Sequence, residues 1–211
     1  KETDDNQMII TGSTSSSDFP LFGVPIQAAL NASYDGFIWR LSSNGALSWG
    51  TYFGGNGEDD PYTLDVYGDQ IVLIGGTTSA DLATSGAHDE SLGGAFDVFV
   101  AHLELNAGFG PTYTLNWRTY MGGSSTDGGV GTVYLGSRYR LGRGEFDDTG
   151  AEIYGVFWTN STGLSTPGSY QELKDLNSDY LVFKMTTSGV RTFSSYLGGS
   201  GPEYIGLSSK V

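Results

Sequence analysis

One seven-residue phrase occurs three times in this chain, and it constrains the fold more than any other feature. An aromatic residue, two spacers, a tyrosine, an apolar residue and two glycines form the copies WGTYFGG, WRTYMGG and FSSYLGG, at residues 49–55, 117–123 and 193–199. Self-similarity of this kind marks a repeat architecture, in which each copy belongs to one supersecondary unit. The sequence therefore predicts three similar units along the chain.

Three further runs line up with the phrase. An aspartate leads an apolar run in each unit, at residues 35–41, 97–103 and 179–185. An apolar run ending in glycine and hydroxyl residues lies upstream, at 8–19, 71–82 and 153–164, and it aligns Gly12, Gly75 and Gly155. A weaker run follows each phrase, near 62–66, 129–134 and 204–207. All are short, rich in β-branched and aromatic residues and bounded by turn formers, which is typical of strands.

Four strand-like runs per unit predict an all-β fold built from repeated four-stranded antiparallel blades of a β-propeller, with a β-trefoil-like threefold arrangement as the alternative. Residues 1–211 form a single repeat domain, with units at about 8–70, 71–152 and 153–211. Three units are fewer than the roughly four to eight blades of an ordinary propeller, so we expect part of a longer array.

The repeated phrase also predicts local structure. We expect each glycine pair to end a strand. Equivalent buried positions are expected for two sets of residues, namely Tyr52, Tyr120 and Tyr196, and Phe37, Phe99 and Leu181.

Residues 13–20, 35–41 and 49–55 together resemble the SBBP-type β-propeller repeat of secreted bacterial proteins. The resemblance covers nearly the whole chain, although the third unit lacks the D-F-P element. It implies a secreted or cell-surface bacterial protein, associated with the outer membrane, that acts as a scaffold, adhesion or binding surface. The resemblance brings no catalytic residue set with it.

Composition excludes several classes of protein. The chain has 24 Asp and Glu against 10 Lys and Arg, a formal net charge of −14. Binding to nucleic acid needs a basic face that neutralises phosphates, so we expect none. Cysteine is absent, which excludes disulfides and Cys-zinc sites. No apolar run reaches the roughly 18 residues of a membrane-spanning helix, so we expect no transmembrane segment.

Recurrent acidic residues are the best candidates for a metal site. One column holds Asp35, Asp97 and Asp179, and a second holds Asp59, Asp127 and Glu203. The densest local cluster is Glu58, Asp59 and Asp60, whose oxygens could bind Ca²⁺. The favoured alternative is that these aspartates accept backbone N–H bonds and fix turns, because no dense D-x-D-x-D loop is present. We expect no other cofactor.

The sequence favours a protein without catalytic activity. The alternative is a glycan-binding or sialidase-like, glycan-active propeller, since residues 42–49 loosely resemble an Asp-box turn. A sialidase would need an arginine cluster, and Arg40, Arg118 and Arg191 lie in different columns. His102 shares a column with Arg40 and Lys184, which predicts a solvated strand residue rather than a catalytic one.

Residues outside the repeated columns are the candidates for ligand or partner contact. Three aromatic rings, those of Tyr34, Trp158 and Tyr170, could stack on sugars. An insertion between Gly123 and Gly155 carries Arg138, Arg140 and Arg143 on an otherwise acidic chain. The expected partners are other repeats or subunits of the same assembly, because open sheet edges and apolar faces invite pairing.

Overall fold

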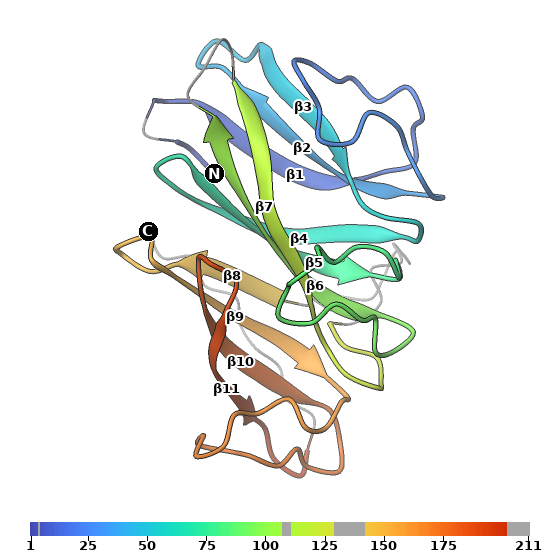
Figure 1. The fold of residues 1–211 in the computed structure, drawn as a ribbon, viewed down its shortest axis with the longest axis vertical. Coiled ribbons are helices and arrows are strands. Elements are labelled where there is room, and N and C mark those ends of the chain that lie inside the picture. The colour runs from blue at the N-terminus through green and yellow to red at the C-terminus, as the bar shows by residue number, and fades with distance from the viewer. Residues whose placement is uncertain (4, 107–110, 129–141, 202–211) are drawn as a thin grey trace.

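The computed structural model describes residues 1–3, 5–106, 111–128 and 142–201, and these ranges form an all-β structure (Figure 1). The strands are β1 (Met8–Thr14), β2 (Asp35–Leu41), β3 (Leu47–Phe53), β4 (Asp59–Tyr67), β5 (Gln70–Thr77), β6 (Asp97–Asn106), β7 (Thr112–Met121), β8 (Gly142–Phe146), β9 (Glu152–Thr159), β10 (Asp179–Thr186) and β11 (Arg191–Leu197). The described ranges contain no helix, and hence none that could cross a membrane.

The strands form three antiparallel sheets that follow one another along the molecule (Figure 1). Sheet 1 has the order β1-β2-β3, sheet 2 the order β4-β5-β6-β7, and sheet 3 the order β8-β9-β10-β11. In Figure 1 sheet 1 lies at the top and sheet 3 at the bottom, with sheet 2 between them. The described sheets remain separate and do not join into a closed ring or barrel.

The three sheets share one register. Each hydroxyl segment faces the aspartate of the following strand, in the pairs Thr14↔Asp35, Thr77↔Asp97 and Thr159↔Asp179. The next strand pair carries a β-bulge at one equivalent position in each sheet, directly after Arg40, His102 and Lys184. A bulge bends and twists its strand, so the same kink is built into all three sheets.

The register corrects the alignment of Gly155. Gly12 faces Phe37 and Gly75 faces Phe99, but the equivalent pair in sheet 3 is Phe157↔Leu181. Gly155 instead faces Phe183, two residues further along the same face of the strands. A Cβ on Gly155 would lie 2.2 Å from the Phe183 ring. In sheet 3 both the glycine and the aromatic ring that it faces therefore lie two residues away from the positions of their counterparts in sheets 1 and 2.

Each glycine pair ends a strand, as the sequence predicts, because β3, β7 and β11 stop at the residue before it. The strand that follows the pair does not stay with its own unit: β4 pairs with β5 and becomes the first strand of sheet 2. Sequence unit and sheet are therefore offset by one strand, and sheet 1 has three strands in the described ranges. The predicted runs near 129–134 and 204–207 lie outside the described residues.

Two apolar cores lie between the sheets. Alternate residues of β5 point to opposite sides, so that Ile71 and Leu73 join the core with sheet 1 while Val72 and Ile74 join the core with sheet 3. Sheet 2 is thus buried on both faces, which explains its continuous apolar run. Phe99 and Leu181 are buried as expected, whereas Phe37 is only half-buried because its face of sheet 1 has no further sheet upon it.

The recurrent tyrosines occupy one environment, as predicted. Tyr52, Tyr120 and Tyr196 are at most 1% exposed. Each tyrosine hydroxyl donates a hydrogen bond to the backbone C=O of a serine in the loop after β1, β5 or β9. The same hydroxyl accepts a hydrogen bond from the backbone N–H of the residue three positions after that serine. The bonded pairs are Ser16 with Phe19, Ser79 with Leu82, and Ser161 with Leu164. Every tyrosine thus fixes a loop of its own sheet, namely the loop that follows β1, β5 or β9.

Candidate functional site

The first recurrent carboxylate of each unit stands where the chain enters a strand. Asp35, Asp97 and Asp179 begin β2, β6 and β10, and all three are completely buried. Each accepts a hydrogen bond from the backbone N–H four residues earlier, and the donors are Asn31 (2.8 Å), Gly93 (2.7 Å) and Asp175 (3.2 Å). The carboxylate closes the loop that leads into the strand, which confirms the turn-fixing interpretation for this column.

The second carboxylate joins one unit to the next. Asp59 and Asp127 each accept the backbone N–H of the second glycine of the pair at 2.8 Å. Each also accepts a serine hydroxyl from the following hydroxyl segment, Ser79 at 2.7 Å and Ser161 at 2.6 Å. These two serines stand two residues after Thr77 and Thr159, a recurrence in the sequence that could have identified them as partners of the acids. Glu203, the third member, lies outside the described residues.

The first glycine of the first two pairs passes between the two acids, and Gly198 of the third pair lies against Asp179. A Cβ on Gly54 would lie 2.7 Å from Asp59 Oδ2 and 3.0 Å from Asp35 Cγ. Gly122 is enclosed in the same way by Asp97 and Asp127, at 2.6 and 3.0 Å. The glycine pair recurs because no side chain fits between these carboxyl groups.

Burial shapes the charge of this site. Removal from water, opposed by hydrogen bonding from Gly93 and supported by the charge of the neighbouring Asp127, raises the pKa of Asp97 to about 6. Burial likewise raises the pKa of Asp59, and Asp35 adds to the shift. One oxygen each of Asp35, Asp59, Asp97 and Asp179 accepts no hydrogen bond from the described residues. Two buried acids that flank one glycine can hold a proton at a pH where an exposed acid has lost it.

The predicted calcium ligands make separate contacts. Asp59 turns inward to the glycine turn, Glu58 accepts a hydrogen bond from Ser33 Oγ at 2.9 Å, and Asp60 accepts one from Ser13 Oγ at 2.6 Å. Asp59 and Asp60 are adjacent in β4 and therefore face opposite sides of the sheet. Across the described part of the chain, no three or more His, Cys, Asp or Glu side chains gather as a metal-binding group. Calcium binding stays a prediction.

The candidate contact residues fall in different surroundings. Tyr34 is half-buried, and burial followed by the charge of Glu58 raises the pKa of its hydroxyl. Trp158 is half-buried in β9. Tyr170 is 89% exposed in the loop between β9 and β10, and this loop also exposes Leu173 and Leu176, which the sequence reading overlooked.

The arginine insertion is only partly described. Arg138 and Arg140 lie outside the described residues. Arg143 lies within β8, the first strand of sheet 3, so that it belongs to a strand and not to an inserted loop. Its guanidinium approaches Glu145 Oε2 at 3.5 Å.

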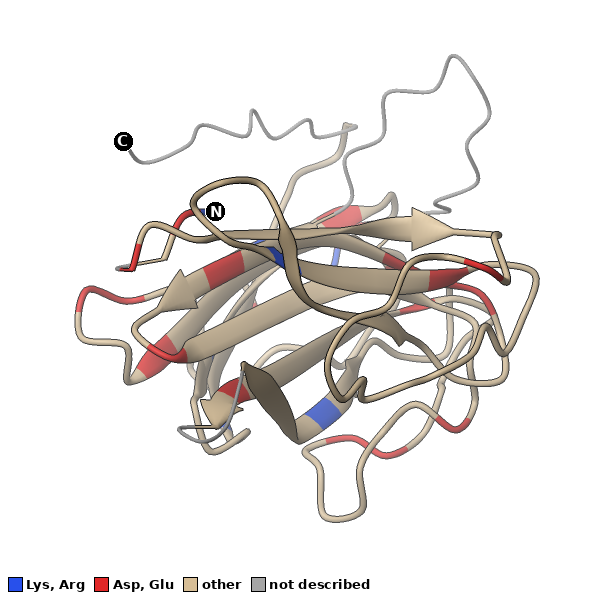
Figure 2. Cartoon of the chain, turned by 90° about the horizontal axis from the view of Figure 1, so that it is seen from above, with Lys and Arg blue, Asp and Glu red and all other residues tan. Residues whose placement is uncertain are grey.

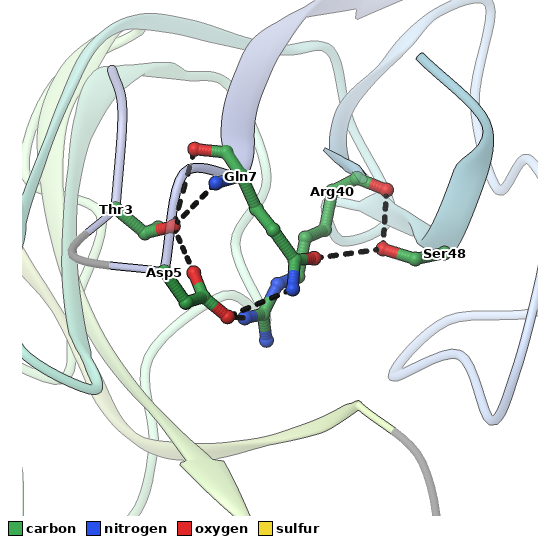
Figure 3. Close-up of polar contacts among 5 residues, drawn as sticks. All are labelled: Thr3, Asp5, Gln7, Arg40 and Ser48. Carbon is green, nitrogen blue, oxygen red and sulfur yellow. Dashed lines mark hydrogen bonds and ion pairs between the residues drawn. The ribbon is translucent and has the colours of Figure 1, made fainter. Parts of the chain in front are cut away.

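A separate polar cluster holds the N-terminal turn against sheet 1 (Figure 3). The guanidinium of Arg40, whose side chain is 5% exposed, donates to Asp5 Oδ2 at 2.7 Å. Hydrogen bonding from Thr3 and then the charge of Arg40 lower the pKa of Asp5. Ser48 Oγ closes the cluster by donating to the backbone C=O of Arg40 at 2.9 Å (Figure 3).

The prediction of a solvated His102 is wrong. The imidazole is 3% exposed, stacks on Trp117 with ring centroids 5.8 Å apart, and contacts Gln70 Oε1 at 2.9 Å. Burial lowers the pKa of His102. His102 faces the core that sheets 2 and 3 share, where Phe146 of sheet 3 packs against it, whereas Lys184 of the same column stays 30% exposed and pairs with Glu152.

Acidic residues are spread around the sheets rather than gathered on one face, while basic residues are few (Figure 2). No protein-family model matches this chain, and no curated protein matches it. The resemblance to the SBBP-type repeat therefore rests on the residues alone.

Proposed function

We propose that this chain is a non-catalytic propeller-type repeat module of a secreted or cell-surface bacterial protein, which serves as a scaffold or binding surface. The observation that carries the proposal is the use of the recurrent acids. Asp35, Asp59, Asp97, Asp127 and Asp179 all accept the backbone N–H four residues earlier. Groups that could have served as acid and base are thus committed to turns and to the links between units.

The shared register and the equivalent bulges support the propeller-type arrangement, because blades of one kind are expected to repeat their strand pairing. The sheets differ mainly in their loops. Loops on a rigid scaffold commonly carry binding residues, and the loop with Tyr170, Leu173 and Leu176 exposes 82% or more of each of these side chains. We assign the binding surface to this loop.

Turnover assays test the absence of catalysis. The purified chain is incubated with a broad panel of chromogenic glycosides, beside the variant Asp97→Asn. A scaffold gives no turnover above buffer for either protein. The proposal is overturned, in favour of a glycan-active enzyme, if the unsubstituted protein turns over a glycoside and a folded Asp97→Asn variant does not.

Glycan binding is the second candidate, because the Tyr170 ring is 89% exposed and an aromatic ring can stack on a sugar that has a face of C–H groups. A glycan array separates this candidate from a protein-binding loop. Binding that Tyr170→Ala abolishes would support a glycan ligand. Tyr67→Ala is the matched control, since Tyr67 is 41% exposed at the end of strand β4. An array without signal rejects the glycan candidate.

A further inference from the structure

The face of sheet 3 that points away from sheet 2 is apolar and open. A groove of about 370 Å³ crosses it, and its lining includes Tyr154, Val156, Val182 and Phe193. Tyr154 is 44% exposed and Phe193 37% exposed. Charged side chains, among them Arg143, Glu145 and Lys184, border these apolar residues, and exposed apolar surface with a polar border marks a site of interaction.

The shared register identifies the equivalent face of sheet 2. Counting from Thr77↔Asp97 and Thr159↔Asp179, the positions of Tyr154 and Val156 correspond to Val72 and Ile74. In the same way Tyr180, Val182, Phe193 and Leu197 correspond to Val98, Val100, Trp117 and Met121. All six residues of sheet 2 lie in the core against sheet 3. The open face of sheet 3 thus repeats, position by position, a face that already packs against a sheet.

The opposite end of the molecule carries the other half of such an interface. In sheet 2, Ile71, Leu73 and Phe99 pack against sheet 1. Their counterparts in sheet 1 are Met8, Ile10 and Phe37, which point away from sheet 2. Met8 is 50% exposed, and Ile10 and Phe37 are half-buried. One chain therefore presents both surfaces of a sheet-to-sheet contact, one at each end.

We propose that a second copy of this chain docks head to tail, with the outer face of its sheet 1 on the outer face of sheet 3. The contact continues the packing already present between sheets 1 and 2 and between sheets 2 and 3. It is heterologous, since two different surfaces meet, and such contacts close into rings or extend as filaments. Closure at two copies would give six sheets and rests on the proposed propeller arrangement.

Charge sets a condition on this contact. Each copy carries a formal net charge of −14, so two copies repel one another at low ionic strength. Charges on the docking face are paired locally, with Lys184 bound to Glu152 at 2.5 Å and Arg143 to Glu145 at 3.5 Å. Added salt should therefore strengthen the association, because it screens the overall repulsion and leaves the apolar contact intact.

The test compares three variants by sedimentation equilibrium, from micromolar to millimolar concentration. Val182→Glu places a charge on the sheet 3 face, and Ile10→Glu places one on the sheet 1 face. Val190→Glu is the matched control, because Val190 is 56% exposed in the β10–β11 hairpin, whose Gly189 packs on Trp117 toward sheet 2. Circular dichroism establishes that every variant keeps the β-sheet spectrum.

The original chain and Val190→Glu should self-associate, and each face variant should bind itself about tenfold more weakly or worse, since a carboxylate buried without a partner is costly. A mixture of Val182→Glu and Ile10→Glu should form a one-to-one dimer, because each retains the face that the other lacks. A monomer at every concentration and salt level overturns the proposal. So does a mixture that fails to associate, or association that neither face variant weakens. Growth beyond two copies upholds the contact but contradicts a six-sheet ring.

Discussion

Replacing Tyr120 by Phe tests whether the tyrosine hydroxyls hold the loops after the hydroxyl segments. The ring stays in its pocket, but Ser79 C=O loses its donor and the backbone N–H of Leu82 loses its acceptor, both in a buried setting. A net hydrogen bond contributes about 1 kcal/mol, and a buried group left unsatisfied costs about 1–3 kcal/mol. We therefore expect Tyr120→Phe to lower the free energy of unfolding by about 2–4 kcal/mol.

Equivalent tyrosines provide the internal comparison. Tyr196 makes the same two bonds to buried partners at 2.9 and 3.0 Å, so Tyr196→Phe should cost about as much. Tyr52 bonds to Ser16 and Phe19, which are partly exposed, so water can replace its hydroxyl and Tyr52→Phe should cost only about 1 kcal/mol. Urea unfolding followed by tryptophan fluorescence measures all three. A loss below about 0.5 kcal/mol for Tyr120→Phe, or a larger loss for Tyr52→Phe, would refute the reasoning.

Three other substitutions probe the acid and arginine sites. Gly122→Ala should destabilise the fold by more than about 2 kcal/mol, because the new methyl group would lie 2.6 Å from Asp97 Cγ, whereas Gly201→Ala meets no atom of the described residues within 4 Å and should be neutral in thermal unfolding. Asp5→Ala leaves the buried Arg40 guanidinium without its carboxylate and should cost about 1–3 kcal/mol in urea, with Asp5→Asn intermediate. Asp97 has a pKa of about 6 when folded and 3.8 as its ordinary value, so the folded chain binds more protons between these values. Its contribution to stability is fully present below about pH 4 and is lost as the pH rises to about 6. The free energy of unfolding should therefore fall over that window relative to Asp97→Asn, and parallel pH profiles for the two proteins would contradict this assignment.

Local patterns predicted much of the fold because their causes are local. The phrase around Tyr120 ends a strand at Met121, because Gly122 must pass between two carboxyl groups. The residues that follow this requirement are neighbours in the sequence, so the pattern is visible there. The aspartate columns were interpreted as turn-fixing groups, and Asp35 and Asp97 are so placed.

Features that depend on distant partners escaped the sequence. The alignment of Gly155 failed because the glycine and Phe183 shifted together by two residues, a change that keeps both on the same face. His102 was expected in water because charged residues share its column, but Phe146 of sheet 3 covers this position, and Gln70 and Trp117 of sheet 2 itself are its partners. The sequence also did not predict that β4 joins sheet 2, because the strand pattern after a glycine pair is the same whether the strand pairs with its own unit or with the next.

The one-strand offset between sequence unit and sheet has a consequence for synthesis of the chain. β4 leaves the ribosome before β5, β6 and β7, yet it contacts β1 and β2 of sheet 1. Pro61 of β4 lies against Gly36 of β2, so β4 can pack on sheet 1 before the other strands of sheet 2 have been synthesised. Once docked there, β4 offers an ordered edge on which β5 can pair. Folding can thus proceed from the N-terminus during synthesis, because a finished sheet positions the first strand of the next sheet. The edge of that strand stays exposed only until the following strand has been translated.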